Sequence, residues 1–240
     1  MKLELLERRL AAQNEGRSTA LVTDLKTGAQ ILLGDGLASG ELELAPEERA
    51  AIDRAVADDR SQTIAEGGRT LFIEVWTPPL RLIVVGAVHI AQTLARMAAL
   101  TGYDVTIIDP RSAFASEERF PGVTLATDWP DEVLPALKPD KRTAIVTLTH
   151  DPKIDDPALQ AALQSDAFYI GALGSRRTHA KRAERLASAG FDAAAFGRIH
   201  GPVGLDIGAL TPGEIAVSIL AQITARLRHD RIKPKTDQPA

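Results

Sequence analysis

Residues 86–91 read Gly-Ala-Val-His-Ile-Ala and follow the apolar run 80–85, where a dinucleotide-binding fingerprint would stand. In the G-x-G-x-x-G/A pattern the first glycine makes a tight turn, the second lets the backbone approach a diphosphate, and the third position needs a small residue. Gly86 and Ala91 suit the outer positions. Val88 takes the middle one, and we expect its branched side chain to point toward the diphosphate. The segment, with His89, predicts a diphosphate site that differs from an ordinary NAD site.

Asp109 ends the next apolar run, 105–108, about twenty residues further on. An acidic residue at this spacing accepts hydrogen bonds from a ribose hydroxyl in dinucleotide-binding folds. Arg111 follows in the same turn. Its side chain could stack on a base or meet a phosphate, and it could equally be a surface arginine of the turn.

His150 and Asp151 follow the apolar run 143–148. In a parallel sheet they emerge at the carboxyl edge, where open α/β sheets bind ligands. They are therefore candidate binding residues. The alternative is that both only cap the strand and the turn before Pro152.

Residues 171–177 carry a strand into a loop and then into a helix that starts with two arginines. Glycine brings backbone N–H groups close to a ligand, a helix amino terminus favours negative charge, and arginine binds phosphate through two hydrogen bonds. We predict an anion cradle made of Gly171, Gly174, Ser175, Arg176 and Arg177. The alternative is a Ser175 cap with solvated arginines.

The segment 199–208 contains glycines between apolar residues, and we predict that it forms a pocket wall with His200 and Gly201 as ligand contacts. The histidines at 89, 150, 179 and 200 lack a recognisable metal-binding spacing. No metal site and no catalytic residue are assigned.

The elements that must position these residues change character near Pro78-Pro79. After it, short apolar runs alternate with amphipathic segments, as in a parallel sheet. Asp156-Pro157 and Thr211-Pro212 are expected to open helices, and Gly190 to close one. Before it, Thr27-Gly28 and Gly67-Gly68 predict hairpins. The fold class is therefore α/β: a Rossmann-like parallel sheet domain (80–229) preceded by a smaller α+β domain (1–79), with a disordered tail (230–240).

Composition excludes several functions. The chain of 240 residues has a net charge of −4, which argues against binding to nucleic acid. It contains no cysteine, so disulfides and thiolate metal sites are excluded. No apolar run is long enough to span a membrane and no secretory signal is visible, so we expect a cytoplasmic protein.

From residue 80 to 227 the chain resembles the XdhC/CoxF family of xanthine dehydrogenase accessory proteins. Six segments carry the resemblance: GAVHIA (86–91), IDPR (108–111), ERFP (118–121), LTHDP (148–152), FYIGALGSRRTH (168–179) and IHGPVGLDIG (199–208). It implies a maturation factor that binds the molybdenum cofactor, as molybdopterin or its dinucleotide. Such a protein protects the cofactor during sulfuration and delivers it to a molybdenum hydroxylase apoenzyme. A cysteine desulfurase is a further candidate partner, and a homodimer is the default assembly.

Two departures from the family pattern affect these expectations. The family fingerprint usually reads Gly-Ala-Gly-His, where this chain has Val88. The cysteine and the Gly-Ser-x-Pro-Arg segment of longer relatives are missing before Pro79, so this chain is not expected to relay sulfur directly.

Three functions compete on the sequence. The leading hypothesis is a non-enzymatic cofactor-binding chaperone. The alternative is an NAD(P)-dependent oxidoreductase, which Gly86 and Asp109 favour. A pterin nucleotidyltransferase is a third option, but its glycine-rich arginine-lysine loop is absent.

Overall fold

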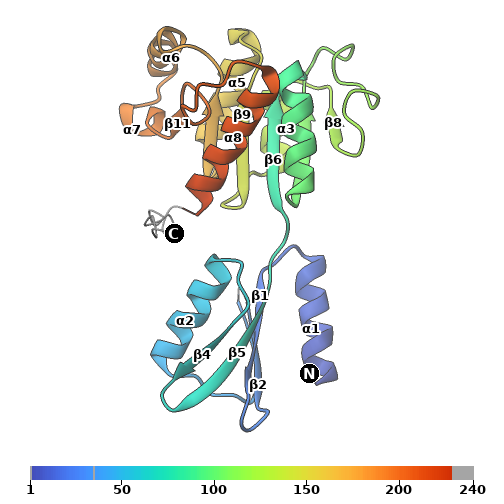
Figure 1. Ribbon diagram of the computed structural model, residues 1–240, viewed down its shortest axis with the longest axis vertical. Coiled ribbons are helices and arrows are strands. Elements are labelled where there is room, and N and C mark those ends of the chain that lie inside the picture. The colour runs from blue at the N-terminus through green and yellow to red at the C-terminus, as the bar shows by residue number, and fades with distance from the viewer. Residues whose placement is uncertain (1, 35, 229–240) are drawn as a thin grey trace, which may run out of the picture. The chain divides into compact units, whose positions relative to one another are not determined.

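The structure is a computed structural model that describes residues 2–34 and 36–228 (Figure 1). The chain divides into two compact units, Met1–Pro78 and Pro79–Ala240. From the sequence we expected a boundary after residue 79. The expected tail, 230–240, lies outside the described residues. No helix in the described part of the chain combines the length and the apolar character needed to cross a bilayer.

The first unit is a five-stranded antiparallel sheet with a helix on each face (Figure 1). Its elements are α1 (Leu3–Asn14), β1 (Thr19–Asp24), β2 (Gln30–Gly34), β3 (Leu37–Gly40), α2 (Pro46–Ala57), β4 (Gln62–Glu66) and β5 (Arg69–Trp76), with strand order β3-β2-β1-β5-β4. Alternate residues of β1 explain the two faces: Val22 packs in the cluster with Ile52 of α2, and Leu21 packs with Leu5 of α1. Both predicted hairpins are present, since β1 pairs with β2 and β4 pairs with β5.

The second unit is a six-stranded parallel sheet between helices. Its elements are β6 (Leu80–Val85), α3 (His89–Leu100), β7 (Tyr103–Ile108), β8 (Thr124–Ala126), α4 (Pro130–Leu137), β9 (Thr143–Thr147), α5 (Pro152–Leu163), β10 (Tyr169–Ala172), α6 (Arg176–Ser188), α7 (Ala193–Phe196), β11 (Ile199–His200) and α8 (Pro212–Leu227). The strand order is β11-β10-β9-β6-β7-β8. This is the Rossmann order, and it confirms the predicted fold class.

The central strand β6 is buried on both faces, which explains its uninterrupted apolar sequence. Leu82 and Val84 face the core cluster that contains Leu94 of α3 and Ile219 of α8. The alternate residues of β6 face a second cluster, which includes α4 and α5. The chain leaves β6 toward β7 on one side, and β9 takes the other side. The loops after β6 and β9 therefore meet at the point where the strand order reverses.

The helix expected to open at Asp156-Pro157 begins earlier. Asp151 is the N-cap of α5 and accepts a hydrogen bond from the backbone N–H of Lys153, while Pro157 lies inside the helix. Asp151-Pro152 and Asp156-Pro157 both suit a helix start. The helix begins at the first pair because this places Ile154 in the core. The capping box at Thr211 is present as predicted, with Glu214 as its second member.

Candidate functional site

Gly86 and Thr149 bring the loops after β6 and β9 into contact at the reversal of strand order. Gly86 has φ of +112°, a left-handed conformation, and its N–H donates to the carbonyl of Ile108 at 2.8 Å. A Cβ at this position would lie 2.6 Å from Cγ2 of Thr149. Glycine is therefore required both for the backbone conformation and for the close approach of the two loops.

Asp109 lies directly beside this loop and is fully buried. Its Oδ2 accepts a hydrogen bond from the Ala87 backbone N–H at 2.8 Å and one from Nη2 of Arg111 at 2.8 Å. Its Oδ1 accepts from the backbone N–H and from Nε of Arg111 at 3.0 and 2.9 Å. These four bonds match the capacity of a carboxylate. The Asp109 carboxylate therefore has no unused lone pair in this structure with which to accept the predicted hydrogen bond from a ribose hydroxyl.

The pKa of Asp109 reflects the same contacts. Burial alone would raise it, but the hydrogen bonds from Arg111 and from the Ala87 backbone outweigh burial, and the pKa lies below its ordinary value of 3.8. Asp109 is therefore a structural anion that joins the loops after β6 and β7. The Arg111 guanidinium lies 4.7 Å from the centre of the Phe114 ring and remains 39% exposed.

Val88 and His89 start helix α3. Val88 is the N-cap, with φ of −90°, which any residue can adopt, so this backbone does not need a glycine. Its side chain is half-buried and packs against the core cluster under α3 and α8. From the sequence we expected this side chain to point toward a diphosphate, and we did not expect its contact with the core. His89 is exposed at the first position of the helix.

Thr149 and Asp155, which the sequence did not single out, organise the segment after β9. Thr149 Oγ1 donates to Oδ1 of Asp155 at 2.6 Å and accepts the backbone N–H of Asp151 at 3.1 Å. Asp155 is 2% exposed, and burial raises its pKa above the ordinary value. His150 is exposed and has φ of +64°. Asp151 caps helix α5, where the alternative from the sequence had it cap a turn before Pro152.

Helix α6 begins at the predicted anion cradle. Ser175 is its N-cap and accepts the backbone N–H of Thr178 at 3.2 Å. Arg176 lines a cavity of about 380 Å³ with residues 202–209, whereas Arg177 lines another of about 210 Å³ with His150. Neighbouring helical residues point about 100° apart, so the two arginines serve different cavities.

The glycines of the cradle and of the pocket wall are required by packing. A Cβ on Gly171 would meet the side chains of Tyr169 and Val203, and Gly174 has φ of +142°. A Cβ on Gly201 would overlap the ring of His179. Their effect on a ligand is therefore indirect, through the shape of the loops.

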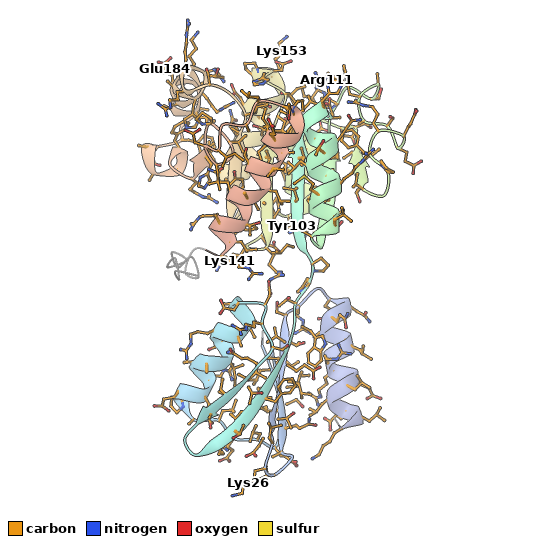
Figure 2. All side chains as sticks on the ribbon, viewed as in Figure 1. Lys26, Tyr103, Arg111, Lys141, Lys153 and Glu184 are labelled. Atoms are coloured by element: carbon orange, nitrogen blue, oxygen red, sulfur yellow. The ribbon has the colours of Figure 1, made fainter. Side chains whose placement is uncertain are left out.

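His200 lies away from His150. Its ring stacks on Tyr169 with centroids 4.8 Å apart, and it lines a cavity of about 630 Å³ with Lys141, Arg198 and Arg226. Figure 2 shows Lys141 at the opposite end of the second unit from Lys153, which follows Pro152 at the start of α5. His150 and His200, both expected among the binding residues, line separate cavities. Burial, with the nearby charge of Arg226, lowers the pKa of His200.

Comparisons with known proteins show the family to which this chain is similar. Residues 82–223 match the model of a family described as the XdhC Rossmann domain. The molybdenum cofactor insertion chaperone PaoD of Escherichia coli K12 is 35% identical over 63% of this chain and 42% of its own length. A protein of Bacillus subtilis 168, described as a probable xanthine dehydrogenase component, is 36% identical over 64% of this chain and 44% of its own length. The chain thus spans less than half the length of these curated relatives.

A solved structure supports the fold of both units. A protein of Bacillus halodurans described as a xanthine dehydrogenase superposes with a TM-score of 0.70 at 24% identity, covering 98% of this chain and 66% of the other. The family match extends from β6 to α8 and includes every loop of the candidate site. The chain is therefore a member of the XdhC Rossmann domain family.

Proposed function

We propose that this protein binds the molybdenum cofactor at the carboxyl edge of its parallel sheet and delivers it to a molybdenum hydroxylase. The observation that carries the proposal is the pair Arg176 and Arg177, which open α6 and whose side chains have no hydrogen-bond or ion-pair partner among the described residues. They are cations beside cavities at the edge where Rossmann folds bind ligands. The chaperone PaoD is named for the same task.

The cargo suits these side chains because molybdopterin carries a phosphate and its dinucleotide form a diphosphate. Guanidinium groups bind such groups through paired, charge-assisted hydrogen bonds. Arg111 stands across the edge from α6 and presents a partly exposed guanidinium that Asp109 holds in place. In this proposal Gly86 and Asp109 fix the shape of the site, and the arginines contact the cargo. His89, His150 and Asp151 border the same edge.

The proposed partners follow from the cargo. The chain contains no cysteine, so sulfur for the cofactor would come from another protein, for which a cysteine desulfurase is the candidate. The receiving partner is a hydroxylase apoenzyme, and the cytoplasm is the expected place of exchange. A homodimer remains an expectation.

The test uses the full chain purified from cells that synthesise the cofactor. Bound pterin is released, oxidised to its fluorescent form and quantified per mole of protein. We expect pterin with the wild type, a several-fold loss in the variant Arg176→Gln/Arg177→Gln, and no loss in Arg96→Gln, which removes an exposed arginine from α3.

A parallel titration with NADH and NADPH addresses the oxidoreductase alternative, which the Rossmann strand order favours and the occupied carboxylate of Asp109 disfavours. Tight NADPH binding without pterin would overturn the proposal. Equal amounts of bound pterin in all variants would show that Arg176 and Arg177 do not contact the cofactor.

A further inference from the structure

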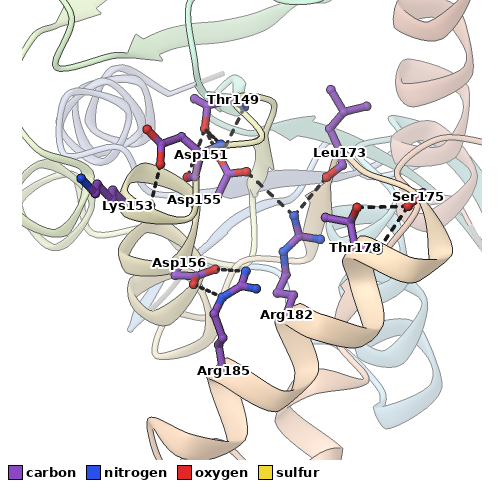
Figure 3. Close-up of polar contacts among 10 residues, drawn as sticks. All are labelled: Thr149, Asp151, Lys153, Asp155, Asp156, Leu173, Ser175, Thr178, Arg182 and Arg185. Atoms are coloured by element: carbon purple, nitrogen blue, oxygen red, sulfur yellow. Dashed lines mark hydrogen bonds and ion pairs between the residues drawn. The ribbon is translucent and has the colours of Figure 1, made fainter.

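A buried arginine of α6 has two side-chain nitrogens without hydrogen-bond partners in the described part of the chain. Arg182 is 1% exposed, and its Nη2 donates to the carbonyl of Leu173 at 3.0 Å (Figure 3). Its Nε and Nη1 are buried without a hydrogen-bond partner among the described residues. Buried charges in proteins are normally paired and fully hydrogen-bonded. Arg182 is therefore an exception that needs an explanation.

Asp155 neutralises Arg182 only in part. Nη2 of Arg182 lies 3.8 Å from Oδ2 of Asp155, which is too far for a hydrogen bond, and Oδ1 of Asp155 is engaged by Thr149. Burial lowers the pKa of Arg182 and raises the pKa of Asp155, so the surroundings disfavour both charges. The pair therefore leaves Nε and Nη1 of Arg182 without an acceptor in the part of the chain that the structure describes.

More positive charge lines the cavity beside Arg182. This cavity, of about 210 Å³, lies between α5 and α6. Its charged lining residues are Arg177, Lys181, Arg182, Arg185 and one carboxylate, Asp155, and Thr178 and His150 also line it. Residues 177, 181 and 185 follow one another at intervals of four, so like charges are neighbours on one helix face and destabilise it. Arg185 is paired with Asp156, at 2.5 and 2.8 Å. Arg177 and Lys181 have no partner among the described residues.

We propose that this cavity, between α5 and α6, is a binding site for a phosphate-type dianion. Arg177 and Lys181 would donate to its oxygens, and Thr178 supplies a hydroxyl at the same wall. Arg182 contributes a buried positive charge to the lining of the same cavity. A tetrahedral dianion suits the site for two reasons. Its oxygens can accept hydrogen bonds from several donors at once, and its two negative charges offset the excess positive charge of the lining side chains.

The site lies apart from the Gly86 loop, and its use of Arg177 rests on the proposed function, in which the same arginine contacts the cargo. The dianion could be free phosphate or the phosphate of a larger ligand, and the chemistry that recognises it is the same. The two sources differ in what surrounds the phosphate, so inorganic phosphate and phenyl phosphate serve as the probes.

The experiment is calorimetric titration of the purified full chain with each probe in phosphate-free chloride buffer. We expect saturable binding of at least one probe at one site per chain. Because a hydrogen bond to a charged group is lost, Arg177→Gln and Lys181→Gln should each weaken binding roughly tenfold. Arg96→Gln is the control, since this exposed arginine lies on α3 and has no part in the proposed site, and it should leave the affinity within about twofold. Both arginines and the lysine are exposed, so the variants should fold.

Thermal unfolding gives a second readout. Phosphate should raise the melting temperature of the wild type above that in chloride of equal ionic strength, and less so for Lys181→Gln. Binding of inorganic phosphate identifies the free anion as sufficient, and binding of phenyl phosphate alone identifies an esterified one. Absence of saturable binding by both probes, or equal losses in Arg96→Gln and Arg177→Gln, would overturn the proposal. These measurements use no pterin. The phosphate site can therefore be refuted while the proposed function stands, and the proposed function can be refuted while the phosphate site stands.

Discussion

The Asp109 carboxylate accepts three hydrogen bonds from Arg111, two from its side chain and one from its backbone. The fourth bond to this carboxylate comes from the backbone of Ala87, in the turn that follows β6. One side chain thus holds together the first two loops of the Rossmann domain. This arrangement makes Asp109 important for stability first, and for ligand binding only through the loops it positions.

Replacing Arg111 with alanine should destabilise the protein by about 2 kcal/mol, because a buried carboxylate loses its counter-ion while water reaches the partly exposed arginine site. The pH dependence should change too. Asp109 has a lowered pKa, so its contribution is present above its ordinary value of 3.8 and is lost as the pH falls through the lower folded value. In Arg111→Ala this acid-dependent loss should disappear. Urea unfolding between pH 7 and pH 3 measures both effects, with Arg96→Ala as control. An unchanged profile would contradict the role assigned to the pair.

Gly86→Ala should cost about 3 kcal/mol, because it combines a left-handed backbone with a collision against Thr149. Gly102→Ala separates the two causes: Gly102 has φ of +88° and nothing near the position of a Cβ. It should cost only about 1 kcal/mol, the expense of the backbone conformation. Adding Thr149→Ser to Gly86→Ala removes the colliding methyl group and keeps the hydroxyl, so part of the loss should return. Equal costs for both alanine variants in chemical unfolding would show that the loop contact is unimportant.

Two histidines should make the protein less stable in mild acid. Burial, and then the charge of Arg182, lowers the pKa of His179, and burial lowers that of His200. The neutral forms are favoured in the folded state, so stability is complete above the ordinary pKa of 6.5 and falls as the pH drops through the folded values. From pH 7.5 to 5.5 the free energy of unfolding should therefore fall.

The double variant His179→Gln/His200→Gln should be less sensitive to this change in pH, whatever its absolute stability. His89→Gln, at an exposed position of α3, should keep the wild-type slope. A slope that persists in the double variant would assign the effect to other groups.

Gln222 holds the loop that follows β11 against α8. Its Oε1 accepts the hydroxyl of Tyr169 at 2.5 Å and the backbone N–H of Gly204 at 2.8 Å. Gln222→Leu leaves two donors without an acceptor and should cost about 2 kcal/mol, whereas Gln222→Glu keeps acceptor oxygens and should cost less. Hydrogen exchange at the Gly204 amide should accelerate in the leucine variant. If exchange there is unaffected, the loop is held by other contacts.

The sequence predicted the parts of the fold that local patterns determine. The run 80–85 is apolar throughout because β6 is covered on both faces, and the Thr211-Glu214 capping box starts α8 where expected. The first of two Asp-Pro pairs opens α5, and only the burial of Ile154 distinguishes it from the second. Local sequence does not contain that packing information.

The site was predicted less completely, because its contacts join distant segments. Asp155 and Arg182 meet across α5 and α6, 27 positions apart in the sequence. One signal was present: Arg182 stands four residues before the buried Leu186, so an arginine occupies the apolar face of its helix. The separation of Arg176 from Arg177 also follows from helical geometry alone.

The reversal of strand order between β6 and β9 has an evolutionary consequence. Because the chain departs in opposite directions from these two strands, no connection crosses the gap between their ends, and the crevice there is a property of chain path. Substitutions on the helix faces cannot close it without changing the topology. The loops that border it can therefore change in sequence while the sheet beneath stays the same.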